Sequence, residues 1–208
     1  SHGYAVLPAN FRGSGGFGLQ HLQRGFGEWG SGMVDDLHLA TRWAVQAGHA
    51  DADRICIYGA SYGAFAALTS VARYPADYQC AAGYAGVYNL NQLSRSDIPF
   101  LPGGDRYLAL AVGTDTEELH RQSPVNMADQ IKVPVLLAHG GEDRRAPAFQ
   151  VEAMQQALQE AGHDPQWIFH RAEGHGFFAQ ANRIAFYQSL LAFFDNALGR
   201  SVAAPMMP

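Results

Sequence analysis

Cysteine is scarce in this sequence, with Cys56 and Cys80 the only two among 208 residues. Two cysteines do not make a disulfide framework, so we expect both to be structural residues, Cys56 as a buried apolar side chain. Long apolar runs are also missing, since no stretch approaches the roughly 20 residues that cross a bilayer. There is no dense run of Lys and Arg, and the formal charge is -5. These absences argue against nucleic acids and membranes as partners and leave small neutral molecules and peptides as candidate substrates.

Apolar residues are abundant enough for one full core. Of the residues, 48% are hydrophobic and 16% are charged, which is typical of one globular domain. We expect this domain over residues 1–200 and a loose tail over residues 201–208. Because the sequence opens on Ser1 without an initiator methionine and runs into an expected strand, we also expect a longer polypeptide upstream, and no cellular compartment is assigned.

Short apolar runs alternate with amphipathic stretches along most of the chain. The expected strands, each bounded by turn residues, are residues 4–8, 54–59, 80–86, 133–139 and 166–170. The expected helices, with apolar positions at helical spacing, are residues 34–46, 62–73, 147–161 and 184–198. This alternation predicts an α/β fold with a mostly parallel sheet and helices on both faces. Residues 87–125 are rich in Gly, Pro, Asn and Ser and predict an irregular cap over one end of the sheet.

The pentapeptide Gly59-Ala60-Ser61-Tyr62-Gly63 has the pattern G-x-S-x-G and lies where an expected strand ends and an expected helix begins. This is the context of a nucleophile elbow, which projects a serine at the carboxyl end of a sheet. Both flanking glycines are expected to be required, because so tight a turn leaves no room for a Cβ on either side. The alternative is that Ser61 only caps the following helix.

A serine hydroxyl is a weak nucleophile and needs a histidine base that is oriented by a carboxylate. In proteins with a nucleophile elbow the chain order is serine, acid, histidine. Glu142 and Asp143 follow the fourth expected strand, and both are sterically plausible acids; the alternative is a solvated charged turn. His175 lies between two glycines on the loop after the fifth expected strand. His139, by contrast, is expected to end its strand as a structural residue.

Together these motifs resemble the catalytic domain of the prolyl oligopeptidase family of serine peptidases. The matching residues spread over nearly the whole chain; they are 10–18 (Asn-Phe-Arg-Gly-Ser-Gly-Gly-Phe-Gly), 59–63, Ser123-Pro124, 133–143 and 173–177 (Glu-Gly-His-Gly-Phe). The run over residues 54–63 is most similar to the bacterial dipeptidyl and acylaminoacyl peptidase branch. The resemblance implies the α/β-hydrolase fold and a peptide substrate, and it implies no metal and no organic cofactor.

The resemblance also implies roles for individual residues. Ser61 would be the nucleophile, His175 the general base and then acid, and Asp143, rather than Glu142, the residue that orients the histidine. The backbone N–H of Tyr62 would be one donor to the oxyanion, and its side chain would line the pocket for the residue before the scissile bond. Arg145 would hold a substrate carbonyl; the alternative is a surface arginine on a charged turn.

Two residues depart from the family pattern, and part of the fold is expected to be missing. Ala64 replaces a glycine and should crowd the helix start slightly, and Ala146 replaces a valine and, if it lines the specificity pocket, widens it. Without the first strands the second oxyanion donor is absent, so we expect these residues alone to hydrolyse about 10²–10³-fold more slowly. A β-propeller is expected upstream, and a second copy could fill the gap in the sheet, giving a homo-oligomer.

Three other functions fit parts of the sequence. An esterase would use the same three residues, because a fold alone does not choose the substrate. A non-catalytic binding or structural module is a second alternative for the chain by itself. A dinucleotide site at the G-x-G-x-x-G of residues 13–18 is disfavoured, because these glycines do not open a helix and because Asp35 and Asp36 precede a helix instead of ending a strand.

Overall fold

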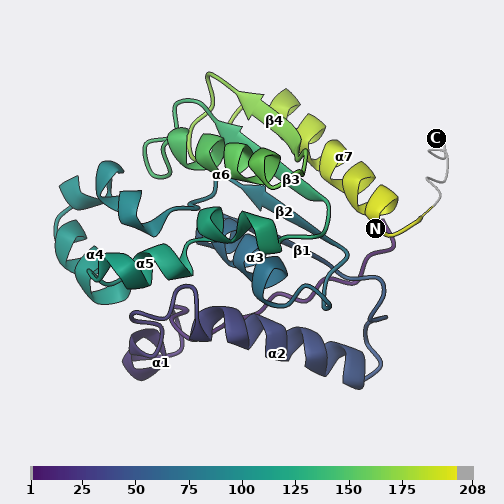
Figure 1. Ribbon diagram of the computed structural model, residues 1–208, viewed down its shortest axis with the longest axis horizontal. Helices are drawn as coiled ribbons and strands as arrows, with labels where there is room; N and C mark the ends of the chain where they lie inside the picture. The colour runs from purple at the N-terminus through teal and green to yellow at the C-terminus, as the bar shows by residue number, and fades with distance from the viewer. Residues whose placement is uncertain (1, 201–208) are drawn as a thin grey trace.

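Four parallel strands form the centre of the computed structural model, which describes residues 2–200 (Figure 1). They lie in the spatial order β1-β2-β3-β4, and they are β1 (Cys56–Ala60), β2 (Cys80–Tyr84), β3 (Val135–Gly140) and β4 (Gln166–His170). The last four strands expected from the sequence are therefore confirmed to within two residues at each end. The tail predicted over residues 201–208 lies outside the described residues.

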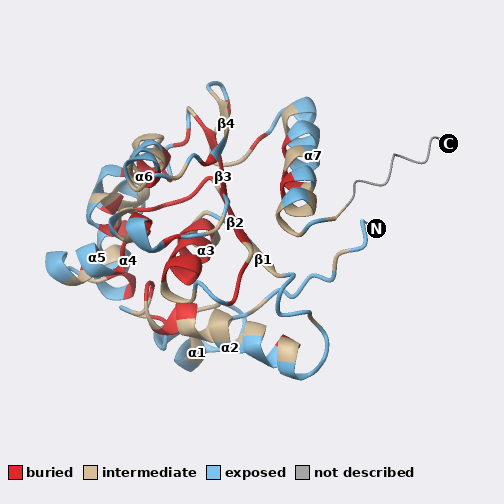
Figure 2. Ribbon diagram, turned by 45° about the vertical axis from the view of Figure 1, so that its right-hand side comes forward, coloured by how far each residue is buried: buried red, intermediate tan, exposed pale blue. Residues whose placement is uncertain are grey.

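Helices cover both faces of this sheet, as Figure 2 shows. On one face lie α3 (Tyr62–Arg73) and α6 (Phe149–Glu160), and on the other lies α7 (Gln180–Ala197). Successive strand residues point to opposite faces, so Leu137 of β3 packs in the cluster with α3 and α6, while Leu136 packs in the cluster with α7. The two central strands, β2 and β3, are buried on both faces, as strands of parallel sheets usually are, whereas β1 and β4 are half-buried. The predicted α/β architecture is confirmed.

The remaining helices extend beyond the two layers. Along the chain they are α1 (Leu19–Gln23), α2 (Gly32–Gln46), η1 (Leu90–Arg95), η2 (Ile98–Phe100), α4 (Gly104–Ala111), α5 (Thr116–Gln122) and η3 (Pro124–Gln130). Helix α2 packs beside α3. The segment predicted as an irregular cap, residues 87–125, is mostly helical instead. Its helices are one to two turns long, too short for a helical period to emerge from the sequence.

Residues 4–8 do not form the strand that the sequence predicts. A strand needs a hydrogen-bonded neighbour, and within the described part of the chain β1 is the edge of the sheet and no strand pairs with this segment. Val6 is 83% exposed as a result. The segment is attached elsewhere, because the hydroxyl of Tyr4 donates to Asp195 at 2.6 Å near the end of α7.

Cys56 and Cys80 form a disulfide bond between β1 and β2. The two residues are direct partners in the parallel register, and their Cα atoms are 4.7 Å apart, within the range that a disulfide spans. The expectation that Cys56 is only a buried apolar side chain is therefore wrong. The bond depends on which strands are neighbours, and the spacing of two cysteines in the sequence does not reveal that.

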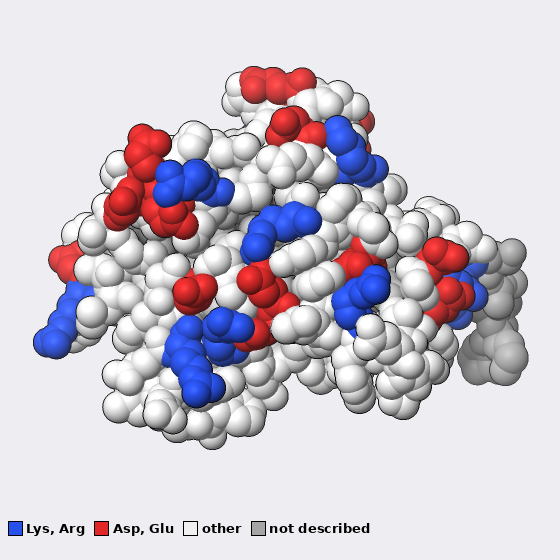
Figure 3. All heavy atoms as spheres, turned by 60° about the horizontal axis from the view of Figure 1, so that its bottom comes forward, with Lys and Arg blue, Asp and Glu red and all other residues white. Residues whose placement is uncertain are grey.

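The surface carries charges of both signs. On the face drawn in Figure 3, Lys and Arg are interspersed with Asp and Glu instead of gathering by sign. Several are paired; Arg12 contacts Asp36 at 2.6 Å and Arg73 contacts Asp35 at 2.8 Å. Among residues 2–200, no helix has the length and apolar character needed to cross a membrane.

Candidate active site

Ser61 lies in the turn between β1 and α3. Its backbone has φ 54° and ψ -119°, a strained conformation for a residue with a Cβ, which persists only where the surrounding contacts impose it. One such contact is the hydrogen bond from the Ser61 N–H to the carbonyl of Tyr84 on β2, at 2.8 Å. The Ser61 side chain makes no capping hydrogen bond to α3, so the alternative role as a helix cap is wrong.

The two glycines of the elbow are not equivalent. A Cβ on Gly59 would lie under 3.0 Å from the backbone carbonyl of Gly63, because the first turn of α3 comes this close to the end of β1. A Cβ on Gly63 would have no neighbour within 4 Å outside its own helix. The expectation that both glycines are required is therefore right for Gly59 and wrong for Gly63.

His175 lies between Ser61 and Asp143. Its Nδ1 is 2.8 Å from Oδ2 of Asp143, and its Nε2 is 3.1 Å from Oγ of Ser61. Asp143 follows β3 and its side chain is fully buried, whereas 30% of the His175 side chain, on the loop after β4, is exposed. Glu142, the alternative acid, is exposed. The carboxyl ends of three strands thus bring together a hydroxyl, an imidazole and a carboxylate in the order needed to move a proton off the hydroxyl.

The carboxylate of Asp143 is held on both oxygens. Oδ1 accepts hydrogen bonds from the backbone N–H groups of Arg145, at 2.9 Å, and Ala146, at 2.8 Å. Oδ2 faces His175 and is also 3.5 Å from Nε2 of His139. His139 is completely buried, and burial lowers its pKa. The acid is therefore fixed by the two N–H groups of a tight turn and by His175.

The loops that carry the acid and the histidine pack backbone against backbone. A Cβ on Gly140 would lie under 3.0 Å from the carbonyl oxygen of Glu173, and one on Gly141 would lie 2.6 Å from the carbonyl oxygen of Arg171. The N–H of Glu142 also donates to the Glu173 carbonyl, at 2.9 Å. Backbone contacts alone therefore fix the distance between the two loops.

Glu173 belongs to the matching motif of residues 173–177, but no role for it was predicted from the sequence. The residue is 4% exposed, and its carboxylate accepts from the N–H of Phe178 at 2.6 Å, the N–H of Ala179 at 3.1 Å and the amide of Asn182 at 2.6 Å. These hydrogen bonds, that of Asn182 foremost, lower its pKa. Helix α7 begins after Ala179, which makes no side-chain cap, and no signal in the sequence marks Glu173 as the acid that holds the segment before this helix.

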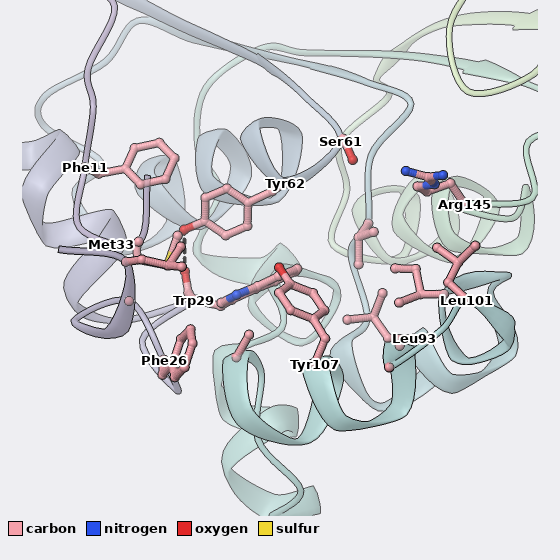
Figure 4. Close-up of a pocket in the computed structure, with 18 of the residues that line it drawn as sticks. Phe11, Phe26, Trp29, Met33, Ser61, Tyr62, Leu93, Leu101, Tyr107 and Arg145 are labelled. Atoms are coloured by element: carbon pink, nitrogen blue, oxygen red, sulfur yellow. Dashed lines mark hydrogen bonds between the residues drawn. The ribbon is translucent and has the colours of Figure 1, made fainter. Parts of the chain in front are cut away.

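A cavity of about 550 Å³ opens beside Ser61. Figure 4 shows Ser61 and Arg145 on one side of it, Phe11, Met33 and Phe26 on the opposite side, and Tyr62, Trp29 and Tyr107 between them. The ring of Tyr62 is fixed in the wall, because its hydroxyl donates to the Trp29 carbonyl at 2.8 Å and the two ring centroids are 4.8 Å apart. Burial raises the pKa of Tyr62, so the phenol stays neutral. Most other lining side chains are apolar; they include Phe11, Leu22, Phe26, Met33, Val87, Leu93, Ile98, Leu101 and Ala111.

Nearly the whole chain matches a known family. The model of the prolyl oligopeptidase family matches residues 1–201. The chain belongs to the prolyl oligopeptidase family. Dipeptidyl aminopeptidase BIII from Pseudoxanthomonas mexicana is 36% identical over 204 residues, which cover 96% of this chain and 30% of that protein. The acylamino-acid-releasing enzyme of Mus musculus is 35% identical over 154 residues, 70% of this chain and 21% of that enzyme.

Solved structures share the fold. A puromycin hydrolase structure matches with a TM-score of 0.86 and 26% identity, covering 94% of this chain and 30% of that one. A Mycobacterium tuberculosis puromycin-hydrolyzing peptidase matches with a TM-score of 0.85 and 26% identity, covering 92% of this chain and 29% of that one. The predicted α/β-hydrolase fold is confirmed. This chain spans between 21% and 30% of the length of these relatives.

The two departures from the prolyl oligopeptidase pattern have structural explanations. Ala64 does not crowd the helix start, because it faces Gly86, where a Cβ would lie only 2.7 Å from that of Ala64. Ala146 is fully buried in the apolar cluster behind the cavity wall and is not among the lining residues. The condition under which Ala146 would widen the pocket, that its side chain lines it, is therefore not met.

Arg145 lines the cavity and is also a surface residue. Its side chain is 52% exposed, and its Nε is 3.7 Å from Oδ1 of Asp97. Its position at the cavity and on a charged turn leaves both predicted roles open, and contact with a substrate carbonyl stays a prediction. Its reach toward the cavity is consistent with contact to a bound molecule.

The dinucleotide alternative has no support in the glycine-rich segment. The run of residues 13–18 ends before α1, a helix of only 5 residues. The carboxylate of Asp36 accepts from Nε and Nη2 of Arg12 at 2.8 and 2.6 Å. Since both carboxylate oxygens of Asp36 already accept hydrogen bonds from Arg12, this acid is not free to bind a ribose.

Proposed function

We propose that this chain carries the active site of a serine peptidase that hydrolyses peptide bonds in short peptides. In this proposal Ser61 is the nucleophile, His175 is the general base and acid, and Asp143 orients the imidazole. The observation that supports it most directly is the position of His175, 2.8 Å from the carboxylate and 3.1 Å from the hydroxyl.

Hydrolysis proceeds in two halves. As Oγ of Ser61 attacks the peptide carbonyl carbon, Nε2 of His175 takes the hydroxyl proton and Asp143 stabilises the imidazolium. The imidazolium gives this proton to the leaving amine, the C–N bond breaks, and an acyl ester remains on the serine. Water, deprotonated by the same imidazole, then attacks the acyl carbon; the bond from that carbon to Oγ breaks, the imidazolium returns its proton to Oγ, and the carboxylic acid leaves. The backbone N–H of Tyr62, at the N-terminus of α3, stabilises the oxyanion in both halves.

The cavity favours a substrate with an apolar side chain before the scissile bond. Its lining is mostly apolar, and burial of an apolar side chain there contributes binding free energy. Tyr62 forms part of the wall, and Arg145 at the rim binds a substrate carbonyl. The names of the two similar proteins, a dipeptidyl aminopeptidase and an acylamino-acid-releasing enzyme, favour peptides over esters.

The chain spans 30% of the dipeptidyl aminopeptidase reported above. The peptidase activity of a longer protein that contains this chain is therefore part of the same proposal. The upstream β-propeller and a homo-oligomer stay predictions.

Matched amide and ester substrates test the proposal. The protein is assayed with the p-nitroanilide and the p-nitrophenyl ester of one apolar acyl group, beside Ser61→Ala. We expect the amide to be cleaved at least about 10³-fold faster by the wild type than by the variant. Cleavage of the ester alone would favour a carboxylic ester hydrolase. If folded wild-type protein cleaves neither substrate, catalysis is contradicted, and a binding or structural module is favoured.

A further inference from the structure

His139 is a buried histidine for which the proposed mechanism has no use. It lies on β3, four residues before Asp143, and its exposed fraction is 0%. A polar ring in such a position costs stability unless it is hydrogen-bonded. One of its nitrogens has a partner, since Nε2 is 2.7 Å from the carbonyl oxygen of Ala146.

The contacts of Ala146 connect this histidine to the acid. The carbonyl of Ala146 accepts from His139, while the N–H of the same residue donates to Oδ1 of Asp143 at 2.8 Å. The N–H of Arg145 donates to that oxygen as well, at 2.9 Å. The imidazole on the rigid strand therefore anchors the turn whose two N–H groups hold the carboxylate, and the carboxylate in turn holds His175.

The tautomer of His139 follows from these contacts. A carbonyl oxygen can only accept, so Nε2 must carry a proton. Nδ1 is buried and has no hydrogen-bond partner among the described residues, so a second proton there would be left unpaired. The charged or titratable groups that act on the ring are Asp143, Glu152 and His175. Burial outweighs the hydrogen bond to the Ala146 carbonyl and the two carboxylates and lowers the pKa of His139, so the ring is neutral and is not a cationic partner of Asp143.

We propose that His139 is a positioning residue, which acts through the turn of residues 143–146 to aim the Asp143 carboxylate at His175. This inference rests on the proposed function, because it assigns His139 its role through the triad. A residue that is merely structural would contribute to stability without setting the geometry between the acid and His175.

Three substitutions separate these two roles. His139→Gln keeps an N–H donor at nearly the reach of Nε2 and cannot ionise. His139→Asn is too short to reach the Ala146 carbonyl, and His139→Leu fills the space without any donor. His49→Gln, on an exposed residue, is the matched control. Circular dichroism and urea unfolding report which variants are folded.

The first readout does not need activity. In proton NMR spectra, the N–H between His175 and Asp143 is expected as a far-downfield resonance, assigned by its loss in His175→Gln. It should be unchanged in His139→Gln and His49→Gln, and shifted upfield or lost in folded His139→Asn and His139→Leu. The second readout is the rate at which a fluorophosphonate labels Ser61. We expect this rate to fall about tenfold in the Asn and Leu variants, as for the loss of one hydrogen bond, and less than about threefold in the Gln variant.

Either readout can overturn the inference. It is wrong if a folded Asn or Leu variant keeps both the resonance and the labelling rate of the wild type, or if the Gln variant loses both. If wild-type Ser61 is not labelled but the resonance responds as expected, the proposed function fails while the positioning of Asp143 by His139 stands. Because the Gln and Asn variants differ by one methylene, the comparison holds even if the Leu variant does not fold.

Discussion

Alanine at Gly59 should disable the elbow, whereas alanine at Gly63 should not. The new Cβ at Gly59 would lie under 3.0 Å from the carbonyl carbon and oxygen of Gly63 and 2.7 Å from its Cα. All three are backbone atoms, so the start of α3 must move away from β1. Overpacking of this kind costs about 1–3 kcal/mol, and a displacement of about 1 Å at a reacting group can cost about 10²-fold in rate. Ser61 lies in the segment that moves.

Gly63 provides the matched comparison, because a Cβ at this position would have no neighbour within 4 Å outside its own helix. It lies inside α3 and its φ is not positive, so alanine should raise the free energy of unfolding by about 0.5–1 kcal/mol. Urea unfolding and fluorophosphonate labelling of Ser61 measure both effects. The reasoning is refuted if Gly59→Ala is as stable and as reactive as the wild type, or if Gly63→Ala loses as much stability as Gly59→Ala.

Four further predictions concern the acid, its neighbours and the disulfide. Asp143→Asn should leave the fold intact and lower the hydrolysis rate by about 10⁴-fold; a loss below tenfold in a kinetic assay would contradict its role. Glu173→Gln should slow labelling of the serine and remove the loss of stability below about pH 4.5 that its lowered pKa predicts; unchanged acid unfolding would count against this. The lowered pKa of His139 means that, below about pH 6.5, the unfolded chain takes up a proton that the folded chain does not. The free energy of unfolding, measured with urea, should therefore fall from pH 7 to pH 5, and it should fall less steeply in His139→Gln. An equal dependence on pH in the two proteins would contradict this. Reducing the bond between Cys56 and Cys80, which are 24 residues apart, should lower the free energy of unfolding by about 3 kcal/mol, and equal midpoints with and without reductant would speak against the bond.

The sequence was sufficient to predict the helices and strands that show a clear pattern within their own residues. The four strands of the sheet and helices α2, α3 and α6 carry their own periodicity and turn signals and are found within two residues of the expected bounds, whereas α7 begins at Gln180, four residues before its expected start. Residues 4–8 have the same apolar character but no strand beside them, because pairing is a property of two segments and not of one. The short helices between residues 87 and 125 lack the length to show a period.

The same distinction applies to the candidate active site, where some residues are identified by motifs and others only by the fold. The motifs identify Ser61 and His175, but they leave Glu142 and Asp143 open as acids, and only the fold brings Asp143 to 2.8 Å from the imidazole. Glu173 acts through three groups that follow it by five to nine residues, and those contacts need the loop to close on α7. Such a role depends on three-dimensional contacts that residue type and spacing do not encode.

Covalent labelling of Ser61 tests the central claim most directly. The wild type, Ser61→Ala and His175→Gln are each treated with a fluorophosphonate, and the adduct is located by mass spectrometry of the intact protein and its peptides. We predict one adduct on Ser61 in the wild type, none in Ser61→Ala, and a strongly slowed reaction in His175→Gln. A folded wild-type protein that forms no adduct, or that forms it on another residue, would contradict the claim that these side chains make a nucleophile.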